Sequence, residues 1–339
     1  MKRVLFLFAM LGAVWISPPR AWSESVRTGA AGAQELRIPV GPRGTALGGA
    51  AIADASGVEA LYWNPAGTAS SEGTEVFFST MSYLLDSNVH YVGLTQAIGG
   101  RFSLGVGAKV VSIGDIAVTT EAVGGPTGES YSPTNTVIGL TLSRQLNERV
   151  AFGVTGNVVH ESIRNETATG AAFDFGFQYD PSWRGVRVGA VVKSLGPKMR
   201  YSGSDFGQPL DFPDSDPSAS PRSVVTESAS FDLPATFQVG VSGDGFHNDD
   251  SRLMLATTFQ SNSYADNELR LGAEYDWREQ LFLRAGTAAS AQEDYVWGVN
   301  YGGGARASLG EWRVFIDYAR QSTSDFFDDQ NLVSVRIQF

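Results

Sequence analysis

From about Glu75 to Phe339, hydrophobic and polar residues alternate one by one along most of the chain. This period of two is the pattern of a β-strand with two different faces, and not of an amphipathic helix. Clear examples are the runs 102–110, 173–179 and 269–275, in which apolar side chains occupy every second position. Counting all such runs predicts about fourteen antiparallel strands.

The two faces of the predicted strands differ sharply in charge. The apolar face carries no charged residue, whereas the other face holds Lys109, Asp174, Arg187, Lys193, Arg270, Glu274, Arg284, Arg313, Asp317 and Arg336. In a soluble sandwich the apolar face packs in the core and the polar face meets water. In a membrane barrel the apolar face meets lipid and the polar face lines the lumen. Periodicity alone does not separate these two folds.

The first residues have the features of a secretory signal peptide. Lys2 and Arg3 precede the uncharged apolar run 4–16, and Ala21-Trp22-Ser23 is a small-x-small cleavage site. We predict a signal peptide over residues 1–23 and an exported mature protein; the alternative is an uncleaved anchor helix. Further along the chain no run of about 20 apolar residues follows, which argues against a helical membrane protein.

Connection lengths favour the membrane barrel over the sandwich. Numbered from the first strand, even connections such as 98–101 and 145–149 are short, whereas the two longest, 114–133 and 196–232, are odd. Outer-membrane barrels have short turns on one side and long loops on the other. The predicted fold class is therefore all-β, a transmembrane antiparallel barrel of about fourteen strands over residues 75–339 in the cell outer membrane. An aromatic girdle is expected at the short-turn ends, from Trp183, Trp277 and Trp312.

Many inward positions of the predicted strands are glycine, a residue that weakens a strand. They are Gly105, Gly107, Gly139, Gly153, Gly176, Gly189, Gly240, Gly272, Gly286 and Gly298. Two explanations remain open. The glycines make room in the lumen for a plug or a passage, or they mark bends at which the wall curves.

The segment before the first strand does not alternate. Its Gly-rich stretch 43–50 lacks the Gly-Lys-Ser/Thr ending of a phosphate loop. Residues 56–59 fit a capping box that opens a short helix, and Asn64-Pro65 would end that helix. We predict that residues 24–74 fold into the lumen as a plug. The candidate plug and lumen residues are Arg43, Gly44, Gly48, Gly49, Asn64, Pro65 and Ala66.

Composition removes several kinds of chemistry. The 339 residues include no Cys, which excludes disulfides, thiolate metal sites and Cys nucleophiles. The net charge of -11 argues against nucleic acid as a partner, because phosphates would be repelled. The three histidines, His90, His160 and His247, form no recognisable catalytic set, and the acidic residues around His247 lack the spacing of a calcium loop. We expect no enzyme activity, no metal and no cofactor.

Ordered motifs resemble a known family. Residues 43–50, followed by Ala60-Leu61-Tyr62-Trp63-Asn64-Pro65-Ala66-Gly67, resemble the PorV/PorQ branch (UPF0164-like) of the FadL-like (OMPP1/FadL/TodX) outer-membrane proteins. The resemblance continues at 114–121, 125–129, 172–176, 196–200 and 233–235. The terminal Phe339 looks like the assembly signal of bacterial outer-membrane barrels.

The resemblance implies a FadL-like barrel with its N-terminal segment in the lumen, embedded in outer-membrane lipid. It also implies two alternative functions. A PorV-like protein is a type IX secretion system component that binds the large translocon and shuttles secreted cargo proteins carrying a C-terminal domain. A FadL-like protein transports fatty acids or other hydrophobic small molecules through the lumen. The first function is our main expectation, and the second is the alternative.

Overall fold

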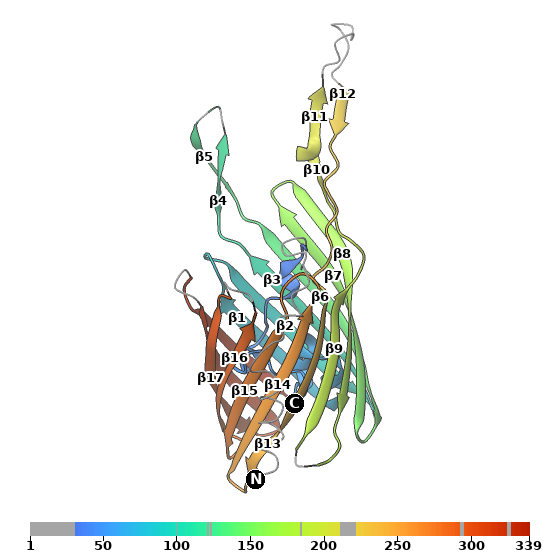
Figure 1. Ribbon diagram of the computed structural model, residues 1–339, viewed down its shortest axis with the longest axis vertical. Helices are drawn as coiled ribbons and strands as arrows, with labels where there is room; N and C mark the ends of the chain where they lie inside the picture. The colour runs from blue at the N-terminus through green and yellow to red at the C-terminus, as the bar shows by residue number, and fades with distance from the viewer. Residues whose placement is uncertain are drawn as a thin grey trace.

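One large antiparallel sheet closes on itself to form a barrel (Figure 1). The computed structural model describes residues 31–339 except 100, 121, 123, 184, 211–221, 292–294 and 324–326. Fifteen strands share the sheet. Of these, β10 pairs only with the first residues of β8, and the remaining fourteen form a ring that β1 and β19 close by pairing over Glu75–Ser82. The predicted all-β barrel of about fourteen strands is therefore confirmed.

The fourteen strands of the wall follow one another in chain order. Their bounds are β1 (Thr74–Ser82), β2 (Asn88–Ile98), β3 (Phe102–Ser112), β6 (Thr134–Asn147), β7 (Val150–Ile163), β8 (Glu166–Tyr179), β9 (Arg187–Leu195), β13 (Thr236–His247), β14 (Ser251–Asn262), β15 (Glu268–Trp277), β16 (Leu281–Ser290), β17 (Trp297–Leu309), β18 (Trp312–Thr323) and β19 (Gln330–Gln338).

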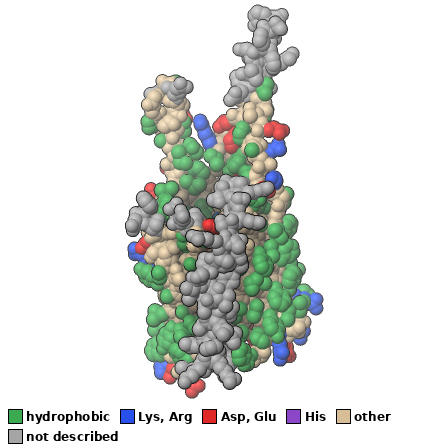
Figure 2. Space-filling view, viewed as in Figure 1, with side chains coloured by type: hydrophobic (Ala, Val, Ile, Leu, Met, Phe, Trp, Pro, Cys, Tyr) green, Lys and Arg blue, Asp and Glu red, His purple; other side chains and the backbone are tan. Residues whose placement is uncertain are grey.

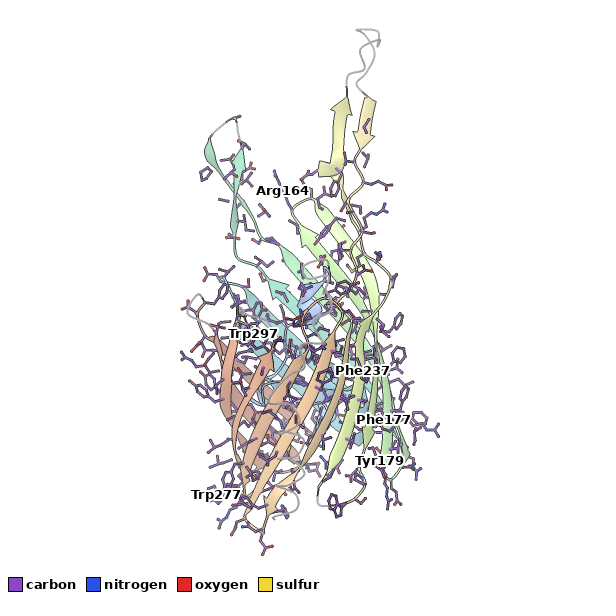
Figure 3. The ribbon with its side chains drawn as sticks, in the orientation of Figure 1. Arg164, Phe177, Tyr179, Phe237, Trp277 and Trp297 are labelled. Carbon is purple, nitrogen blue, oxygen red and sulfur yellow. The ribbon has the colours of Figure 1, made fainter. Side chains whose placement is uncertain are left out.

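The wall turns its apolar face outward, as the alternation predicts. On β6, Leu140 and Leu142 are 56% and 54% exposed, whereas Thr141 and Ser143 are 1% and 2% exposed. Phe177, Tyr179 and Phe237 point away from the barrel in the same way (Figure 3). The visible wall is largely apolar between charged side chains that gather toward its two ends (Figure 2). A continuous apolar surface of this size is typical of contact with a membrane.

The two ends of the barrel differ. At the short-turn end the strands are joined by tight connections, and exposed Trp183, Trp277 and Trp312 lie there. The ring of Trp312 lies 6.0 Å from that of Phe339, whose backbone pairs with Thr74. At the long-loop end two hairpins rise above the wall (Figure 1). One is formed by β4 (Ile116–Thr120) and β5 (Gly125–Tyr131), the other by β11 (Gly207–Leu210) and β12 (Arg222–Val225), which follow β10 (Tyr201–Gly203) and the 3-10 helix η5 (Ser204–Phe206).

Residues 31–73, here called the N-terminal segment, pack against the inner face of the wall. They contain the 3-10 helices η2 (Gln34–Leu36), η3 (Gly57–Glu59) and η4 (Pro65–Ser70) and the short helices α2 (Pro42–Ala46) and α3 (Ala60–Trp63). The segment starts at the long-loop end, where Gly32 N donates to Asp232 O at 3.1 Å, and reaches β1 at the short-turn end. Helix α2 contacts β16, β17, β18 and β19, and η4 contacts β3, β6, β7 and β8. No helix among the residues described is long and apolar enough to cross a membrane.

Most of the inward glycines face this segment. A Cβ at Gly153 or Gly176 would overlap Pro65 or Asn64, and one at Gly286 would overlap the backbone of Leu47. Gly105, Gly189, Gly240 and Gly272 approach the segment in the same way. A Cβ at Gly107, Gly139 or Gly298 would instead meet side chains of the wall. Making room in the lumen therefore explains seven of these glycines, and wall packing explains the other three.

The prediction of a capping box at residues 56–59 is wrong. Ser56 precedes η3 but makes no side-chain cap, and the carboxylate of Glu75 accepts from Val58 N at 3.0 Å instead. A residue of the wall thus supplies the cap that a local side chain was expected to supply. The end of the helix is correctly predicted, because α3 stops at Asn64, whose side chain then caps η4 by accepting from Ala66 N.

Candidate functional site

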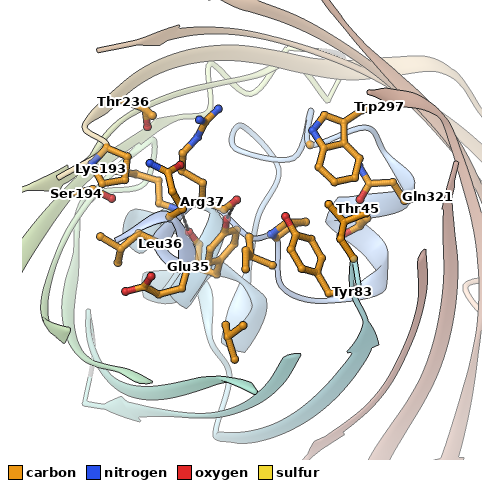
Figure 4. Close-up of a pocket in the computed structure, with 18 of the residues that line it drawn as sticks. Glu35, Leu36, Arg37, Thr45, Tyr83, Lys193, Ser194, Thr236, Trp297 and Gln321 are labelled. Carbon is orange, nitrogen blue, oxygen red and sulfur yellow. Dashed lines mark hydrogen bonds between the residues drawn. The ribbon is translucent and has the colours of Figure 1, made fainter. Parts of the chain in front are cut away.

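The lumen holds two main cavities on opposite sides of the N-terminal segment. The vestibule is the cavity of about 630 Å³ at the long-loop end (Figure 4). The lower cavity, of about 520 Å³, lies at the short-turn end among the turn 248–251, Asp276 and Arg278. Of the predicted plug residues, Gly48 and Gly49 line the vestibule and Arg43 lines the lower cavity.

Five aromatic side chains line the vestibule. Tyr62 and Trp63 come from the N-terminal segment, and Tyr83, Tyr295 and Trp297 come from the wall and its loops. The ring centroids of Tyr62 and Trp63 lie 5.0 Å apart, and those of Tyr83 and Trp297 lie 6.4 Å apart. Such a lining stabilises an apolar molecule by excluding water and by ring contacts.

The two-residue alternation of β17 on its own would place Trp297 on the outward face with Val299, but Trp297 lies inside the barrel. The pairing of β17 with β18 shifts between Trp297 and Asn300, as at a β-bulge. The shift moves the end of β17 out of the two-residue alternation, since a one-residue slip exchanges the faces of a strand. Val299 is 58% exposed on the outside, whereas Trp297 lines the vestibule (Figure 4).

The floor of the vestibule is fixed by two buried lysines. Lys193 Nζ lies 3.6 Å from the ring centre of Tyr62 and donates to the Tyr62 carbonyl at 2.7 Å. Lys109 Nζ lies 4.7 Å from the same ring and donates to the Ile38 carbonyl at 2.9 Å. Wall residues thus hold the backbone of the N-terminal segment at two points.

The charged groups at the vestibule edge neutralise one another. Glu268 accepts from Arg270 at 2.7 Å and lies 3.5 Å from Arg37. Charges of both signs thus line the described part of the vestibule, whereas an ion filter uses a ring of one sign.

A larger ionic cluster joins the N-terminal segment to the wall at the lower cavity. Arg43 contacts Glu274 at 2.9 Å and Asp54 at 2.6 Å. Arg284, from β16, contacts Glu274 at 2.6 Å and also pairs with Asp317. Because both the segment and three wall strands contribute, the cluster fixes their relative position.

The structure brings the other predicted site residues close to the wall. Gly44 lies against the Trp63 ring, Gly48 against the backbone of Thr287, and Gly49 against Arg270. Gly48 and Gly49 have φ of 65° and 80°, a backbone region that favours glycine. The side-chain nitrogen of Asn64 donates to Ile52 O and Phe177 O, at 2.8 and 3.1 Å, while Pro65 and Ala66 follow against β7 and β8.

The three histidines lie at separate places within the described part of the chain. His90 and His160 are exposed and bond Thr80 and Thr169 across the strands. His247 lies at the lower cavity beside Asp249 and Asp250. The described residues hold no cluster of three or more His, Cys, Asp or Glu residues suited to a metal ion.

Sequence reasoning missed Glu35, which sits at the edge of the vestibule. Glu35 is 2% exposed, and burial together with the neighbouring Glu161 raises its pKa to about 7. Asn135 donates to one of its oxygens at 3.3 Å, whereas Glu161 is held by Ala33 N and the Tyr201 hydroxyl at 3.1 and 2.7 Å. No local motif marks Glu35, because its environment comes from β6 and β7.

The raised pKa of Glu35 predicts a pH-dependent stability of the vestibule edge. The folded state favours the protonated acid, so this stabilisation is complete below the ordinary pKa of 4.5 and is lost as pH rises through about 7. We expect amide exchange of residues 33–38, at matched intrinsic rates, to be at least about tenfold faster at pH 8 than at pH 5. Glu35→Gln should abolish the difference and Glu129→Gln, in the exposed hairpin, should preserve it; a Glu35→Gln protein that keeps it would contradict the assignment.

Comparison with solved structures gives the fold class. The CymD monoaromatic hydrocarbon channel superposes with a TM-score of 0.58 at 16% identity, covering 89% of this chain and 98% of that one. The Pseudomonas putida toluene transporter TodX gives 0.55 at 13% identity, covering 88% and 96%. A Pseudomonas aeruginosa FadL homologue gives 0.52 at 15% identity, covering 89% and 99%. This chain has the fold of the FadL-like outer-membrane channels.

The FadL-like fold agrees with the superfamily that the motifs suggest, but the finer assignment receives no support. The sequence matches no protein-family model and no curated protein. At these low identities the likeness gives the barrel architecture alone, and the PorV/PorQ branch is not indicated by any comparison. The fold alone does not give the function, because one fold can host unrelated functions.

Proposed function

We propose that this protein is an outer-membrane channel that takes up a hydrophobic small molecule, with the vestibule as its first binding site. The observation that carries the proposal is the aromatic lining of Tyr62, Trp63, Tyr83, Tyr295 and Trp297 around a cavity of about 630 Å³ inside the lumen. That volume lies within the range of about 300–1,000 Å³ common for small-molecule sites. The chain would bind and conduct its ligand without chemical change, so it would not be an enzyme.

The proposed orientation follows from the two ends of the barrel. Short turns face the periplasm in outer-membrane barrels and long loops face the exterior. The vestibule would then meet the ligand from outside the cell, and the lower cavity would face the periplasm. Export through the signal peptide at residues 1–23, which lie outside the described part of the chain, belongs to the same proposal.

The N-terminal segment would act as the plug between the two cavities. Its contacts with both lysines, with the Glu274 cluster and with the wall glycines support this role. Passage of a ligand would require part of the segment to move. The Ile38 and Tyr62 carbonyl groups accept hydrogen bonds from Lys109 and Lys193 at the vestibule floor. Movement of this part of the segment would therefore change the floor of the vestibule.

The secretion function has less support than the transport function. Its support is the motif resemblance, and no comparison points to a translocon or to secreted cargo. The aromatic rings of the vestibule instead favour the transport alternative, since a cavity of this size suits a small molecule and not a folded protein.

Filling the vestibule tests the transport proposal. Ala288 of β16 lines the vestibule, and its neighbour Ala289 is exposed on the outer face. We expect Ala288→Trp to reduce uptake of a labelled aromatic hydrocarbon by at least about tenfold in cells that depend on this protein, because the indole occupies the cavity.

Ala289→Trp is the matched control, since it adds the same ring toward lipid, where aromatic residues are tolerated. Both variants should show the same heat-dependent gel mobility, which reports an intact barrel. Equal uptake by Ala288→Trp and the wild-type protein would argue against the vestibule as the transport site.

A further inference from the structure

Four inward carboxamides surround part of the vestibule. Gln238 of β13 lies opposite Gln260 of β14, and Asn300 of β17 lies opposite Gln321 of β18. All four line the vestibule. We refer to Gln238, Gln260, Asn300 and Gln321 as the carboxamide belt.

The belt holds hydrogen-bond acceptors without donors. Its four residues are between 3% and 8% exposed, and their side-chain carbonyl oxygens receive no hydrogen bond from the described residues. A buried acceptor without a donor is costly, and evolution generally removes it or pairs it. Four in one cavity lining indicate that the cavity is built to receive hydrogen-bond donors from its ligand.

The orientation of Gln260 is fixed by its neighbours. Asn262 uses its side-chain nitrogen to donate to Asp266 O at 2.6 Å, which leaves its side-chain oxygen as an acceptor. Gln260 Nε2 donates to that oxygen at 2.7 Å. Exchanging the nitrogen and oxygen of Gln260 would break this chain of bonds. Its carbonyl oxygen is therefore the group left without a donor, on a side chain that lines the vestibule.

The charges of the lining identify the kind of donor. The carboxamides are neutral, and Glu268, opposite Gln260, is already paired with Arg270 and near Arg37. A cationic ligand would find no unpaired carboxylate at the belt, and an anionic ligand would find no unpaired cation there, since Arg37 and Arg270 both lie against Glu268. A neutral hydroxyl group supplies a donor without a charge, while the aromatic rings across the cavity bind an apolar body.

We infer that the ligand of the vestibule is a neutral hydroxylated aromatic molecule, a phenol, rather than a plain hydrocarbon. The inference rests on the proposed transport function and specifies its substrate class. A hydrocarbon of the same size fills the cavity but leaves the belt oxygens unpaired. A site built to bond a hydroxyl discriminates against the analogue that lacks it for this reason.

Size-matched probes test the inference. p-Cresol and p-xylene differ by a hydroxyl in place of a methyl group. We would measure equilibrium binding of each to the full mature chain in lipid nanodiscs, with empty nanodiscs as the blank. We expect p-cresol to bind at least about tenfold more tightly, which corresponds to one net hydrogen bond.

Belt variants locate the source of the preference. Gln260→Met and Gln321→Met keep the side-chain length but remove two of the four acceptors, so the double variant should bind p-xylene as before and show a clearly smaller preference for p-cresol. Gln145→Met, at the short-turn end, is the control and should keep it. Retained p-xylene binding shows that the double variant is folded.

The outcomes separate the two proposals. Equal binding of both probes to the wild-type chain would overturn the phenol inference and leave hydrophobic transport standing. A preference for p-cresol that is undiminished in the double variant would overturn the assignment to the belt. Binding of neither probe would contradict the vestibule as a binding site, and the phenol inference would fall with it.

Discussion

Glu274→Gln is expected to lower the free energy of unfolding by about 3–5 kcal/mol. The substitution removes the charge of one member of a buried ionic cluster and leaves its arginine partners charged. The Glu274 side chain is 7% exposed and receives bonds from Arg43 at 2.9 and 3.0 Å and from Arg284 at 2.6 Å. Arg284 is 4% exposed at its side chain and would keep only Asp317 as a partner. The loss is large because two buried guanidinium groups each lose a charged hydrogen-bond acceptor and keep only one carboxylate partner.

Urea-induced unfolding in lipid vesicles, followed by tryptophan fluorescence, measures this change. Glu279→Gln is the matched control, because Glu279 pairs with Arg306 at 2.9 Å but is 71% exposed. Exposed ion pairs contribute about 0–1 kcal/mol, so the control should stay within that range. Equal and small effects of the two substitutions would show that the cluster does not hold the N-terminal segment to the wall.

The barrel itself was predictable from the sequence because a membrane barrel repeats one simple rule along every strand. Leu140 meets the outside and Thr141 the inside, and this order depends only on the two-residue period of the backbone. The unequal connections were equally visible, since they are lengths of chain. The inward charges Lys109, Asp174 and Lys193 were placed correctly by the same alternation.

Features that depend on contacts between distant residues were not predictable. The cap of η3 comes from Glu75 rather than Ser56, and the environment of Glu35 comes from Glu161 and Asn135. Trp297 faces the lumen because of a register shift in β17, which the alternation of residues does not reveal. A single sequence lists the inward charges but does not pair them, so the Arg43–Glu274–Arg284 cluster required coordinates.

The family motifs illustrate the same limit for function. The stretch 60–67 was recognisable as a motif, and the structure shows what its residues contact in this chain. Asn64 and Pro65 fill spaces left by Gly176 and Gly153, so part of the motif serves to dock the N-terminal segment. A docking role is compatible with transport and with secretion, which explains why the motif alone did not choose between them.

Asn64→Ala is expected to release η3, α3 and η4 from the wall while leaving the barrel intact. Asn64 is fully buried, donates to Ile52 O and Phe177 O, and accepts from Ala66 N at 3.1 Å. Each buried group left without a partner costs about 1–3 kcal/mol. The loss falls on the docking of the segment, because the fourteen paired strands do not depend on the Asn64 side chain.

Hydrogen exchange and single-channel conductance measure the release. Amides of residues 57–70 should exchange at least about tenfold faster in Asn64→Ala, and conductance should rise if the segment closes the lumen as proposed. Asn88→Ala, at an exposed position where β2 begins, should change neither quantity. Faster exchange with unchanged conductance would show that the segment is docked through Asn64 but does not close the lumen. Unchanged exchange would mean that the Lys109, Lys193 and Glu274 contacts hold the segment without it.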